Sequence, residues 1–530
     1  MSENDCITYQ GSGYFSKLIN DYLDQKPELD VLYNRFPSIE NFSLQIEEKS
    51  KTFSHEHRNI LFKVLEQQYS KTEISQQTDK NIQSLLDSNT FTITTGHQLN
   101  LFTGPVYFIY KIISTINLCK RLKAEYPNHN FVPIYWMASE DHDFEEINHF
   151  FFKGKKISWN RKYSGAVGRL DTSNMADVYD LFKNELGIGI NSEFLVNLFQ
   201  KAYLEHQNLA EATRFLVNEL FKDYGLVIID GDNKQLKKLF TPYLEKELFE
   251  NISFKKVSET LPKLKDYTIQ VNPREINIFY CKNDIRERIV FEENKFKILN
   301  TSLTFSKDEI KKELIEFPEN FSPNVVLRPL YQEVILPNLC YIGGGGELAY
   351  WFELKSMFDA HEVAFPILLL RNSVLIVSEK QNEKRKRLNL TWNHLFTEQQ
   401  KLYNEKVKEL STISFDFSQQ KEFLKLQFNA LKELAIKTDI SFEKAVKAQE
   451  IKQTKGLENL EKRLSKAEKK IHHDKLERIL MLQNELFPNQ SLQERKSNFS
   501  EFYIEYGALF FETLFEKLEP LNHTFSIISL

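Results

Sequence analysis

Apolar residues in the middle of the chain form short continuous runs that alternate with amphipathic stretches. The run "FTITT" ends at Thr95 and precedes "VYFIYKIISTINLCKRLKAEY", where apolar residues recur at helical spacing. A second apolar run, "FVPIYWMA", follows at 131–138. Buried strands alternating with amphipathic helices are typical of βαβ units. The pattern predicts an α/β fold in which helices cover both faces of a parallel sheet.

Three later apolar runs fit the same sheet, at 225–232, 324–330 and 365–373. Between them, "INIFYCKNDIRERIVFEENKFKIL" alternates apolar and polar residues with a turn at 282–284. This alternation is typical of an antiparallel meander. Because it interrupts the α/β pattern, we interpret the meander as an insertion into the core.

The last third of the chain lacks helix breakers. No proline lies between Pro366 and Pro488, and Gly456 is the only glycine between Gly346 and Gly507. The absence of both residue types predicts long helices. Two sets of apolar residues have heptad spacing: Leu388, Trp392, Leu395 and Leu402, then Leu457, Leu460, Leu464, Ala467 and Ile471. They predict a helical hairpin or coiled coil that pairs with a second copy; the alternative is a helical bundle folded onto its own core.

The predicted organisation is a helical segment, an α/β core, a coiled-coil arm and a segment that returns to the core, at 1–88, 89–375, 376–490 and 491–530. Within the core, insertions are expected at about 150–222 and 240–320.

Composition removes several classes of function. The formal net charge is −5, so no global basic field favours nucleic acid or acidic lipid. "MSENDCITYQ" has no signal-peptide pattern, and "FPILLLRNSVLIV" is too short to span a bilayer and contains Arg371. The four cysteines are far apart and form neither a zinc pattern nor a disulfide framework. We therefore expect a cytoplasmic protein with no nucleic-acid or membrane partner.

The end of the first strand is a candidate binding segment. Ligands of parallel sheets bind beyond the carboxyl ends of the strands. The side chains expected there are those of His97, Gln98 and Asn100. Thr103 is a plausible N-cap, and Pro105 suits a first helical turn, so backbone N–H groups around Gly104 are expected to form an anion site. The alternative is an ordinary strand-to-helix loop with a surface histidine.

The second candidate follows "FVPIYWMA". It is an acidic group that we interpret as catalytic: Glu140, Asp141, His142 and Asp143, with Asn148 nearby as a binding residue. Crowded carboxylates raise one another's pKa values and suit a bound ammonium, a cation or proton transfer. The alternative is an acidic helix start. His142 and His149 offer metal ligands with the carboxylates, but their spacing matches no known zinc pattern, so no metal is predicted.

The third candidate segment is 322–355. Asn324 and Arg328 are expected at a strand end, with Gln332 after them. The run Gly343, Gly344, Gly345, Gly346 and Glu347 then opens a helix. Glycines permit close backbone approach to a ligand, although the pattern matches no known phosphate loop. Arg371 would place a second guanidinium at the same edge of the sheet. The alternatives are a flexible loop and an arginine that caps strand carbonyls.

Together the segments resemble the BshC family of bacillithiol biosynthesis. The resemblance rests on "TGHQLNLFTGPVYFIYK", "PIYWMASEDHDFEEINH", "SPNVVLRPLYQEVILPNLCYIGGGGELAYW" and "PILLLRNS". It implies a Rossmann-like core, distantly similar to class I aminoacyl-tRNA synthetases, and a homodimer formed through the coiled-coil arm. It also implies a carbon–nitrogen ligase that adds L-cysteine to the amine of glucosaminyl-malate to form bacillithiol.

In such a site ATP is an expected but unproven cosubstrate, because the cysteine carboxylate must be activated. The glycine segments would face phosphate, and Arg328 or Arg371 would bind malate carboxylates or phosphate. Asp141 or Asp143 would hold an ammonium, and Glu140 or His142 would take the amine proton. A different activated cysteine donor is an alternative. Two other functions compete with the ligase: a nucleotide-binding transferase of another substrate class, and a non-catalytic dimeric nucleotide sensor or scaffold.

Overall fold

The computed structural model describes residues 6–282, 285–414, 416–438 and 440–530. It divides the chain into two compact units. One contains the chain up to Ile376 together with Leu492–Leu530, and the other is Val377–Ser491. The predicted turn at 282–284 lies outside the described residues at its last two positions.

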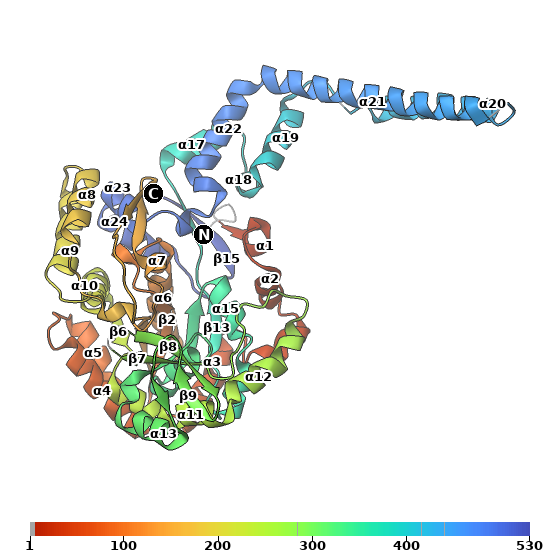
Figure 1. Cartoon of the computed structure of the whole chain (residues 1–530). Coiled ribbons are helices and arrows are strands. Elements are labelled where there is room, and N and C mark those ends of the chain that lie inside the picture. Colours follow the sequence, from red (N-terminus) through yellow and green to blue (C-terminus); the bar gives the residue numbers. More distant parts are fainter. Residues whose placement is uncertain (1–5, 283–284, 415, 439) are drawn as a thin grey trace. The chain divides into compact units, whose positions relative to one another are not determined.

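The first unit is built on a five-stranded parallel sheet with strand order β13-β12-β2-β3-β6 (Figure 1). Its strands are β2 (Thr90–His97), β3 (Asn130–Met137), β6 (Val227–Asp230), β12 (Asn338–Gly343) and β13 (Ile367–Leu370). The apolar runs that predicted β2, β3, β6 and β13 are confirmed as strands of one sheet. In the register between the first two strands, Thr94 lies opposite Ile134 and His97 opposite Met137.

The prediction of a strand at 324–330 is wrong. The side-chain oxygen of Asn324 accepts hydrogen bonds from the backbone N–H groups of Val326 (2.9 Å) and Leu327 (3.3 Å), which turns the chain. Helix α14 (Arg328–Ile335) then begins, with proline in its first turn. The strand that the prediction missed is β12, which starts ten residues after Arg328. Asn324 and Arg328 are therefore at a helix start and not at the end of a strand of the parallel sheet; Asn324 directly follows β11 of the meander.

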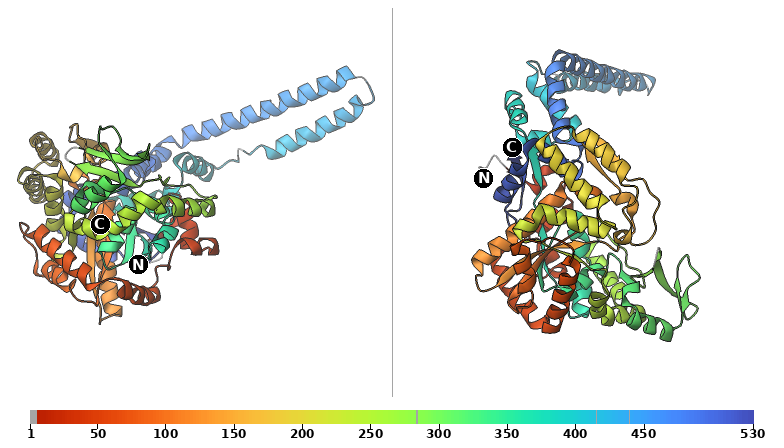
Figure 2. Two further views of the ribbon diagram at one scale, coloured as in Figure 1. Left: turned by 60° about the horizontal axis from the view of Figure 1, so that its bottom comes forward. Right: turned by 90° about the vertical axis from the view of Figure 1, so that its left-hand side faces the viewer.

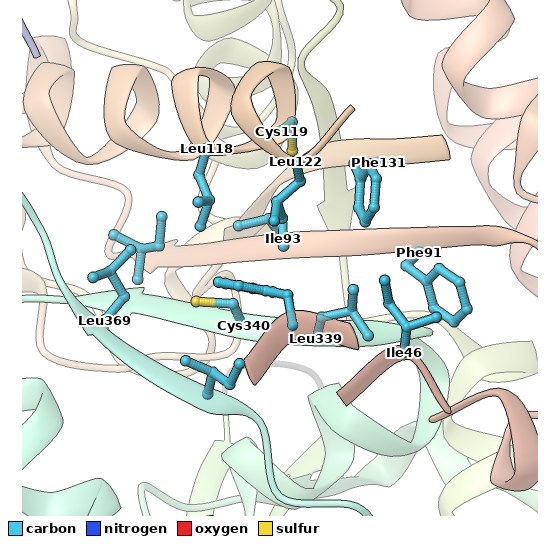
Figure 3. Close-up of a cluster of buried hydrophobic side chains, with 13 residues drawn as sticks. Ile46, Phe91, Ile93, Leu118, Cys119, Leu122, Phe131, Leu339, Cys340 and Leu369 are labelled. Carbon is cyan, nitrogen blue, oxygen red and sulfur yellow. The ribbon is translucent and has the colours of Figure 1, made fainter. Parts of the chain in front are cut away.

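Helices cover both faces of the sheet. Helix α6 (Tyr107–Glu125) contributes Leu118 and Leu122 on one side, and α3 (Ile39–Thr52) contributes Ile46 on the other (Figure 3). Between them lie apolar side chains of the strands, including Ile93 and Leu369. A strand that is buried on both faces has to be apolar throughout, which explains the near-continuous runs in the sequence.

The remaining elements of this unit lie around the sheet. The N-terminal helices are α1 (Tyr9–Ser12), α2 (Lys17–Leu23), α3, α4 (His55–Tyr69) and α5 (Gln76–Ser84). Helices α8 (Ala176–Leu186), α9 (Ile190–Leu204), α10 (Leu209–Phe221), α11 (Lys234–Glu250) and α12 (Ile252–Thr260) follow the hairpin β4–β5 (His149–Phe152 and Lys155–Ser158). Helices α13 (Lys307–Glu316), α15 (Gly345–Trp351) and α16 (Lys355–Ala360) come later.

The predicted meander is confirmed as an antiparallel sheet. Its strands have the order β10-β9-β8-β7-β11 and span Thr304–Phe305, Lys295–Ile298, Ile285–Glu292, Ile278–Lys282 and Phe321–Pro323. A third sheet, β1-β15-β14, joins the two ends of the chain through Cys6–Thr8, Thr524–Ser529 and Val374–Val377. Helices α23 (Phe499–Tyr506) and α24 (Ala508–Lys517) precede its middle strand.

The second unit is helical. Its helices are α17 (Glu379–Arg387), α18 (Trp392–Phe396), α19 (Gln399–Leu410), α20 (Ser418–Ala435), α21 (Ile440–Ile471) and α22 (His473–Leu486). Helices α20 and α21 lie side by side (Figure 2), and Phe428, Ala435 and Val446 are buried between them. The predicted seam at 388–402 is wrong as one helix, because Asn389 has a φ of 53° and the residues fall on separate elements. The seam at 457–471 lies within α21.

Among the described residues, no helix has both the length and the hydropathy that crossing a bilayer requires.

Candidate active site

A cavity of the first unit lies at the carboxyl edge of the parallel sheet and has a volume of about 720 Å³. Eleven of the predicted site residues line it: His97, Gln98, Glu140, Asp141, His142, Asn324, Arg328, Gly344, Gly346, Glu347 and Arg371. Nine of them lie at the ends of β2, β3, β12 and β13, and Asn324 and Arg328 lie at the start of α14. The meander closes the cavity with Phe279 and Arg286. Binding beyond the strand ends is the arrangement common to open parallel sheets.

Glu140 anchors one end of the cavity. Its Oε1 lies 2.5 Å from the Nζ of Lys237, which is 1% exposed and also lies 3.5 Å from Asp232. Burial raises the pKa of the Glu140 carboxyl, against the opposing charge of Lys237. Asp232 is held in turn by two hydrogen bonds from Arg169, at 2.7 and 2.9 Å. At this end of the cavity, Lys237 and Arg169 therefore balance most of the negative charge of Glu140 and Asp232.

Asp141 remains available to a cationic ligand. Burial opposes its ionisation, but hydrogen bonds from His142 and Gln98 outweigh burial and lower the pKa of the carboxyl. The Gln98 amide donates at 2.9 Å to Asp141 and at 2.9 Å to Glu146. Asp141 is thus an ionised carboxylate at the wall of the cavity.

The geometry around His142 determines its tautomer. A guanidinium N–H of Arg286 lies 2.7 Å from His142 Nδ1. Because a guanidinium only donates, Nδ1 accepts from Arg286 and the ring N–H is on Nε2. Asp141 Oδ1, 3.6 Å from the same Nδ1, therefore accepts from the His142 backbone N–H, at 2.7 Å, and not from the ring. The next predicted catalytic residue, Asp143, is exposed and does not line the cavity.

Lys111 and Glu347 form an internal ion pair at the other end of the cavity. Lys111 Nζ lies 2.5 Å from a Glu347 oxygen and donates to the Gly96 carbonyl at 2.7 Å. Glu347 also accepts from the Tyr341 hydroxyl and from the Gly344 N–H, each at 2.8 Å. The carboxylate is already fully hydrogen-bonded, so it shapes the cavity wall and holds the glycine turn closed.

Two arginines of the cavity differ in their partners. Arg371 is 3% exposed and makes two parallel hydrogen bonds to Glu494, at 2.7 and 3.0 Å. Arg328 instead donates to the Gln332 amide oxygen at 3.1 Å and to the Tyr350 hydroxyl at 3.3 Å. Among the described residues Arg328 has no carboxylate partner, so its charge is open to a ligand.

His97 is buried beside Tyr107 and Phe108. Burial, together with the nearby charge of Lys111, lowers the pKa of the imidazole to about 3. The ring is therefore neutral at physiological pH. Its Nε2 has no hydrogen-bond partner among the described residues.

The predicted anion site around Gly104 is wrong. The Gly104 N–H donates to the Leu101 carbonyl at 2.9 Å, and the Val106 N–H donates to the Ser497 carbonyl at 2.8 Å. Thr103 has a φ of 67° and is not an N-cap, since α6 begins at Tyr107 after Val106. These N–H groups are used inside the protein and are closed to phosphate.

The other predicted site residues that do not line the cavity are Asn100, Gly104, Asn148, Gln332, Gly343 and Gly345. Asn100 packs against Gly104, and Asn148 is buried next to His149. Gly345 faces Ile19. Gln332 is fully buried behind Arg328.

Sequence reasoning missed the cations that close the cavity: Lys111, Arg274, Arg286, Arg288 and Arg495, with Lys237 behind them. Lys111 was detectable as the single charge in the apolar half-helix "YFIYKII". Arg286 and Arg288 alternate on one strand and so share a face. Among the described residues, no group of three His, Cys, Asp or Glu side chains is placed to hold a metal ion.

Comparison with known proteins decides the family. The N-terminal Rossmann-like domain of bacillithiol biosynthesis BshC matches residues 2–372, and the C-terminal coiled-coil domain of BshC matches residues 374–530. This chain belongs to the bacillithiol biosynthesis BshC family. The resemblance seen in its sequence motifs is thereby confirmed, as are the Rossmann-like core and the coiled-coil domain.

Relatives of the BshC family match along almost the whole chain. A protein of Flavobacterium psychrophilum named "Putative cysteine ligase BshC" is 62% identical over 525 residues, 99% of each chain. Proteins with the same name from Flavobacterium johnsoniae and Christiangramia forsetii are 59% and 56% identical, again over 99% of each chain. A solved structure named as an arginyl-tRNA synthetase of Campylobacter jejuni is 10% identical, covers 84% of this chain and 98% of its own, and has a TM-score of 0.20, too low to support an argument.

Proposed function

We propose that this protein is a ligase that joins the carboxyl group of L-cysteine to the amine of glucosaminyl-malate and so forms bacillithiol. The observation that carries the proposal is the charge of the cavity. Among the described residues, seven cationic and three acidic side chains line it, although the whole chain has a net charge of −5. A cationic cavity with an acidic end suits a substrate that carries carboxylates at one side and an amine at the other.

In this proposal the acidic end binds and deprotonates the amine. Ionised Asp141 holds the ammonium, and Glu140 accepts the proton that leaves the nitrogen as it attacks. Burial raises the pKa of Glu140, which makes this carboxylate a stronger proton acceptor than an exposed one. Arg328 binds a carboxylate of the malate group, because its charge has no acidic partner among the described residues.

The amide bond also requires activation of the cysteine carboxyl group. We propose ATP as the cosubstrate: the cysteine carboxylate attacks the α-phosphate and releases pyrophosphate, and the amine then displaces AMP. Arg274, which precedes the meander, and Arg288 in β8 have no ion-pair partner among the described residues and are suited to phosphate. We further propose a cytoplasmic homodimer that pairs through the arm, where Leu460 and Ile471 remain exposed.

The test is a reaction of purified full-length protein with glucosaminyl-malate, cysteine and ATP, followed by mass spectrometry. Bacillithiol and AMP are the expected products. Asp141→Asn should abolish product formation, whereas Asp143→Asn, a matched change outside the cavity, should retain it. Product at an equal rate without ATP rejects the adenylate step. If no product forms with any activated cysteine donor, the ligase proposal itself is wrong.

A further inference from the structure

Gln332 connects the cavity to a buried polar network under the sheet. Its side chain is fully buried and lies one helical turn after Arg328 in α14. Its amide oxygen accepts from the Arg328 guanidinium at 3.1 Å, and its amide nitrogen donates to Glu333 at 2.9 Å. The side chain therefore has one end on a residue of the cavity and the other end in the core.

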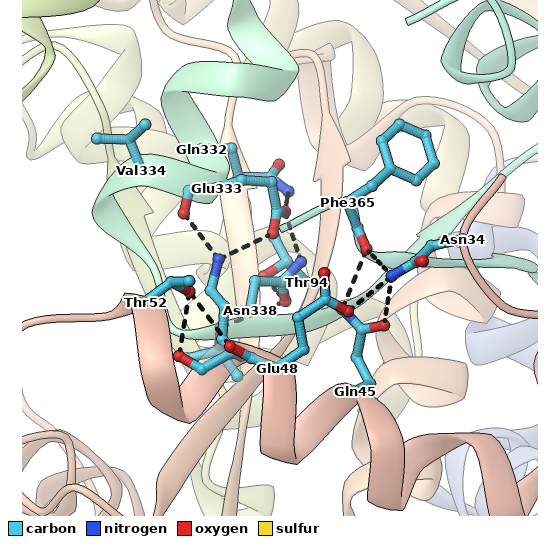
Figure 4. A network of polar contacts seen from close by, with 12 residues as sticks. Asn34, Gln45, Glu48, Thr52, Thr94, Gln332, Glu333, Val334, Asn338 and Phe365 are labelled. Carbon is cyan, nitrogen blue, oxygen red and sulfur yellow. Dashed lines mark hydrogen bonds and ion pairs between the residues drawn. The ribbon is translucent and has the colours of Figure 1, made fainter. Parts of the chain in front are cut away.

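The network behind Gln332 determines which way its amide points. The Glu333 oxygen that receives the Gln332 amide also accepts from Asn338 at 2.7 Å (Figure 4). The second Glu333 oxygen lies 3.5 Å from Lys49 Nζ, and Lys49 also donates to the Glu333 carbonyl at 2.9 Å. A guanidinium only donates hydrogen bonds, so Arg328 requires an acceptor from Gln332. The NH₂ of Gln332 must consequently face Glu333, and its oxygen must face Arg328.

The chemistry of the contact explains why an amide suits this position. A carboxylate beside Arg328 would hold the guanidinium but would also neutralise it, as Glu494 does for Arg371. The amide oxygen of Gln332 holds the guanidinium in place, and because an amide is neutral, it does not offset the positive charge of Arg328. Tyr350 contributes a second neutral contact, and the Tyr341 ring lies beneath the guanidinium at 5.7 Å.

We infer that Gln332 is a positioning residue, which orients Arg328 as an open anchor for an oxyanion of the substrate. The inference rests on the proposed function for the identity of that substrate. The oxyanion is a carboxylate of the malate group or a phosphate of the nucleotide, since a guanidinium binds both by paired hydrogen bonds. Gln332 acts through Arg328 and does not touch the ligand.

Two substitutions test this role by calorimetric titration of the full-length protein with L-malate and, separately, with ATP. Gln332→Met removes both hydrogen bonds at similar size and should raise the Kd of the ligand that Arg328 binds by about tenfold. Gln332→Glu should raise it further, because the new carboxylate pairs with Arg328. The ligand whose affinity falls identifies the oxyanion. In turnover, the KM of the corresponding substrate should rise, with kcat changed less than about twofold.

Thr94→Val is the matched control. Thr94 donates to Asn338 at 2.8 Å in the same network, and among the described residues no hydrogen bond joins it to Gln332 or Arg328. Thr94→Val should lower the midpoint of thermal unfolding, as Gln332→Met does, and leave the Kd values for L-malate and ATP unchanged. If Gln332→Met does not fold, Gln332→Glu is combined with Glu333→Gln, which removes the like-charge contact at 2.9 Å and supplies an amide donor to the new carboxylate.

Wild-type affinity in both Gln332 variants overturns the inference, whatever the turnover rate. It is also overturned if the wild-type protein binds neither L-malate nor ATP, because Arg328 is then no oxyanion anchor. Product formation is measured in a separate reaction, so failure of the ligase proposal is distinguishable from failure of this one. A fall in malate or ATP affinity without any ligase product supports the role of Gln332 and rejects the proposed reaction.

Discussion

The regions around Arg371 and Arg328 use the same residue type in opposite ways. Arg371 is paired with Glu494, a residue 123 positions later and fully buried, so the pair ties the C-terminal segment to the sheet. Among the described residues, the hydrogen-bond partners of the Arg328 side chain are the neutral groups of Gln332 and Tyr350. A charge that is neutralised inside the protein contributes to folding, whereas one held by neutral groups remains available for binding. Lining a cavity is therefore not enough to make a residue a ligand-binding one.

The largest expected effect is on stability, at Arg371. Arg371→Gln leaves the Glu494 carboxylate buried without its partner, which typically costs about 3–5 kcal/mol. Urea denaturation at pH 7 measures the loss of free energy of unfolding. The double variant Arg371→Gln with Glu494→Gln should regain part of it, because the uncompensated charge is gone. A loss below about 1 kcal/mol in the single variant would contradict the structural role of the pair.

Arg328→Gln should weaken ligand binding and leave the stability of the fold almost unchanged, the reverse of what is expected for Arg371→Gln. No buried charge is left alone, so the free energy of unfolding should change by less than about 1 kcal/mol. Binding of the anionic substrate should weaken roughly 10- to 100-fold, the value of hydrogen bonds to a charged group. Calorimetry with L-malate and ATP, beside the urea curve, measures both quantities. Equal loss of stability in the Arg328 and Arg371 variants would remove the distinction between the two regions.

The free energy of unfolding should also depend on pH, through the buried imidazole of His97. Its pKa is lowered from 6.5 to about 3 by burial and by the charge of Lys111. Between these values the unfolded chain binds a proton that the folded chain does not, so stability falls as the pH drops below 6.5. From pH 7 to pH 5 the wild type should lose about 2 kcal/mol more than His97→Phe. Urea curves at the two pH values measure this difference, and parallel losses in the two proteins would refute it.

The smallest effect is expected at Tyr350. Tyr350→Phe removes one neutral hydrogen bond to Arg328, at 3.3 Å, and leaves the Gln332 contact in place. Affinity for the anionic ligand should fall by a factor of about two to ten. The same calorimetric titration measures it. A loss as large as that of Arg328→Gln would mean that the hydroxyl itself binds the ligand.

The strands of the sheet show where sequence patterns suffice. β2, β3, β6 and β13 were predictable, because strands buried on both faces are apolar throughout. Residues 324–330 misled because valines favour strands, while the Asn324 turn and a proline at the second helical position start a helix there. β12 was hidden, since it begins with the polar Asn338 and its apolar stretch runs directly into the glycines after it.

In the candidate site, too, some residues were predictable from the sequence and others were not. The acidic group at 140–143 and the arginines stood out by residue type at strand ends, although Asp143 proved to be outside the cavity. The expected anion site at Gly104 failed, because nothing in the local sequence reveals that Ser497 accepts the Val106 N–H. Lys237 and Glu494 reach the site from distant parts of the chain. Local patterns carry no information on such partners.

By itself, the sequence determined the parallel sheet, the long helices of the arm and the family, since these depend on periodicity and on contiguous motifs. Only the tertiary structure decided which charges are free. Arg328 and Arg371 look alike in the sequence, yet one keeps its charge and the other is neutralised. Pairing and burial depend on distances of a few ångströms in space, and residues far apart in the chain set those distances.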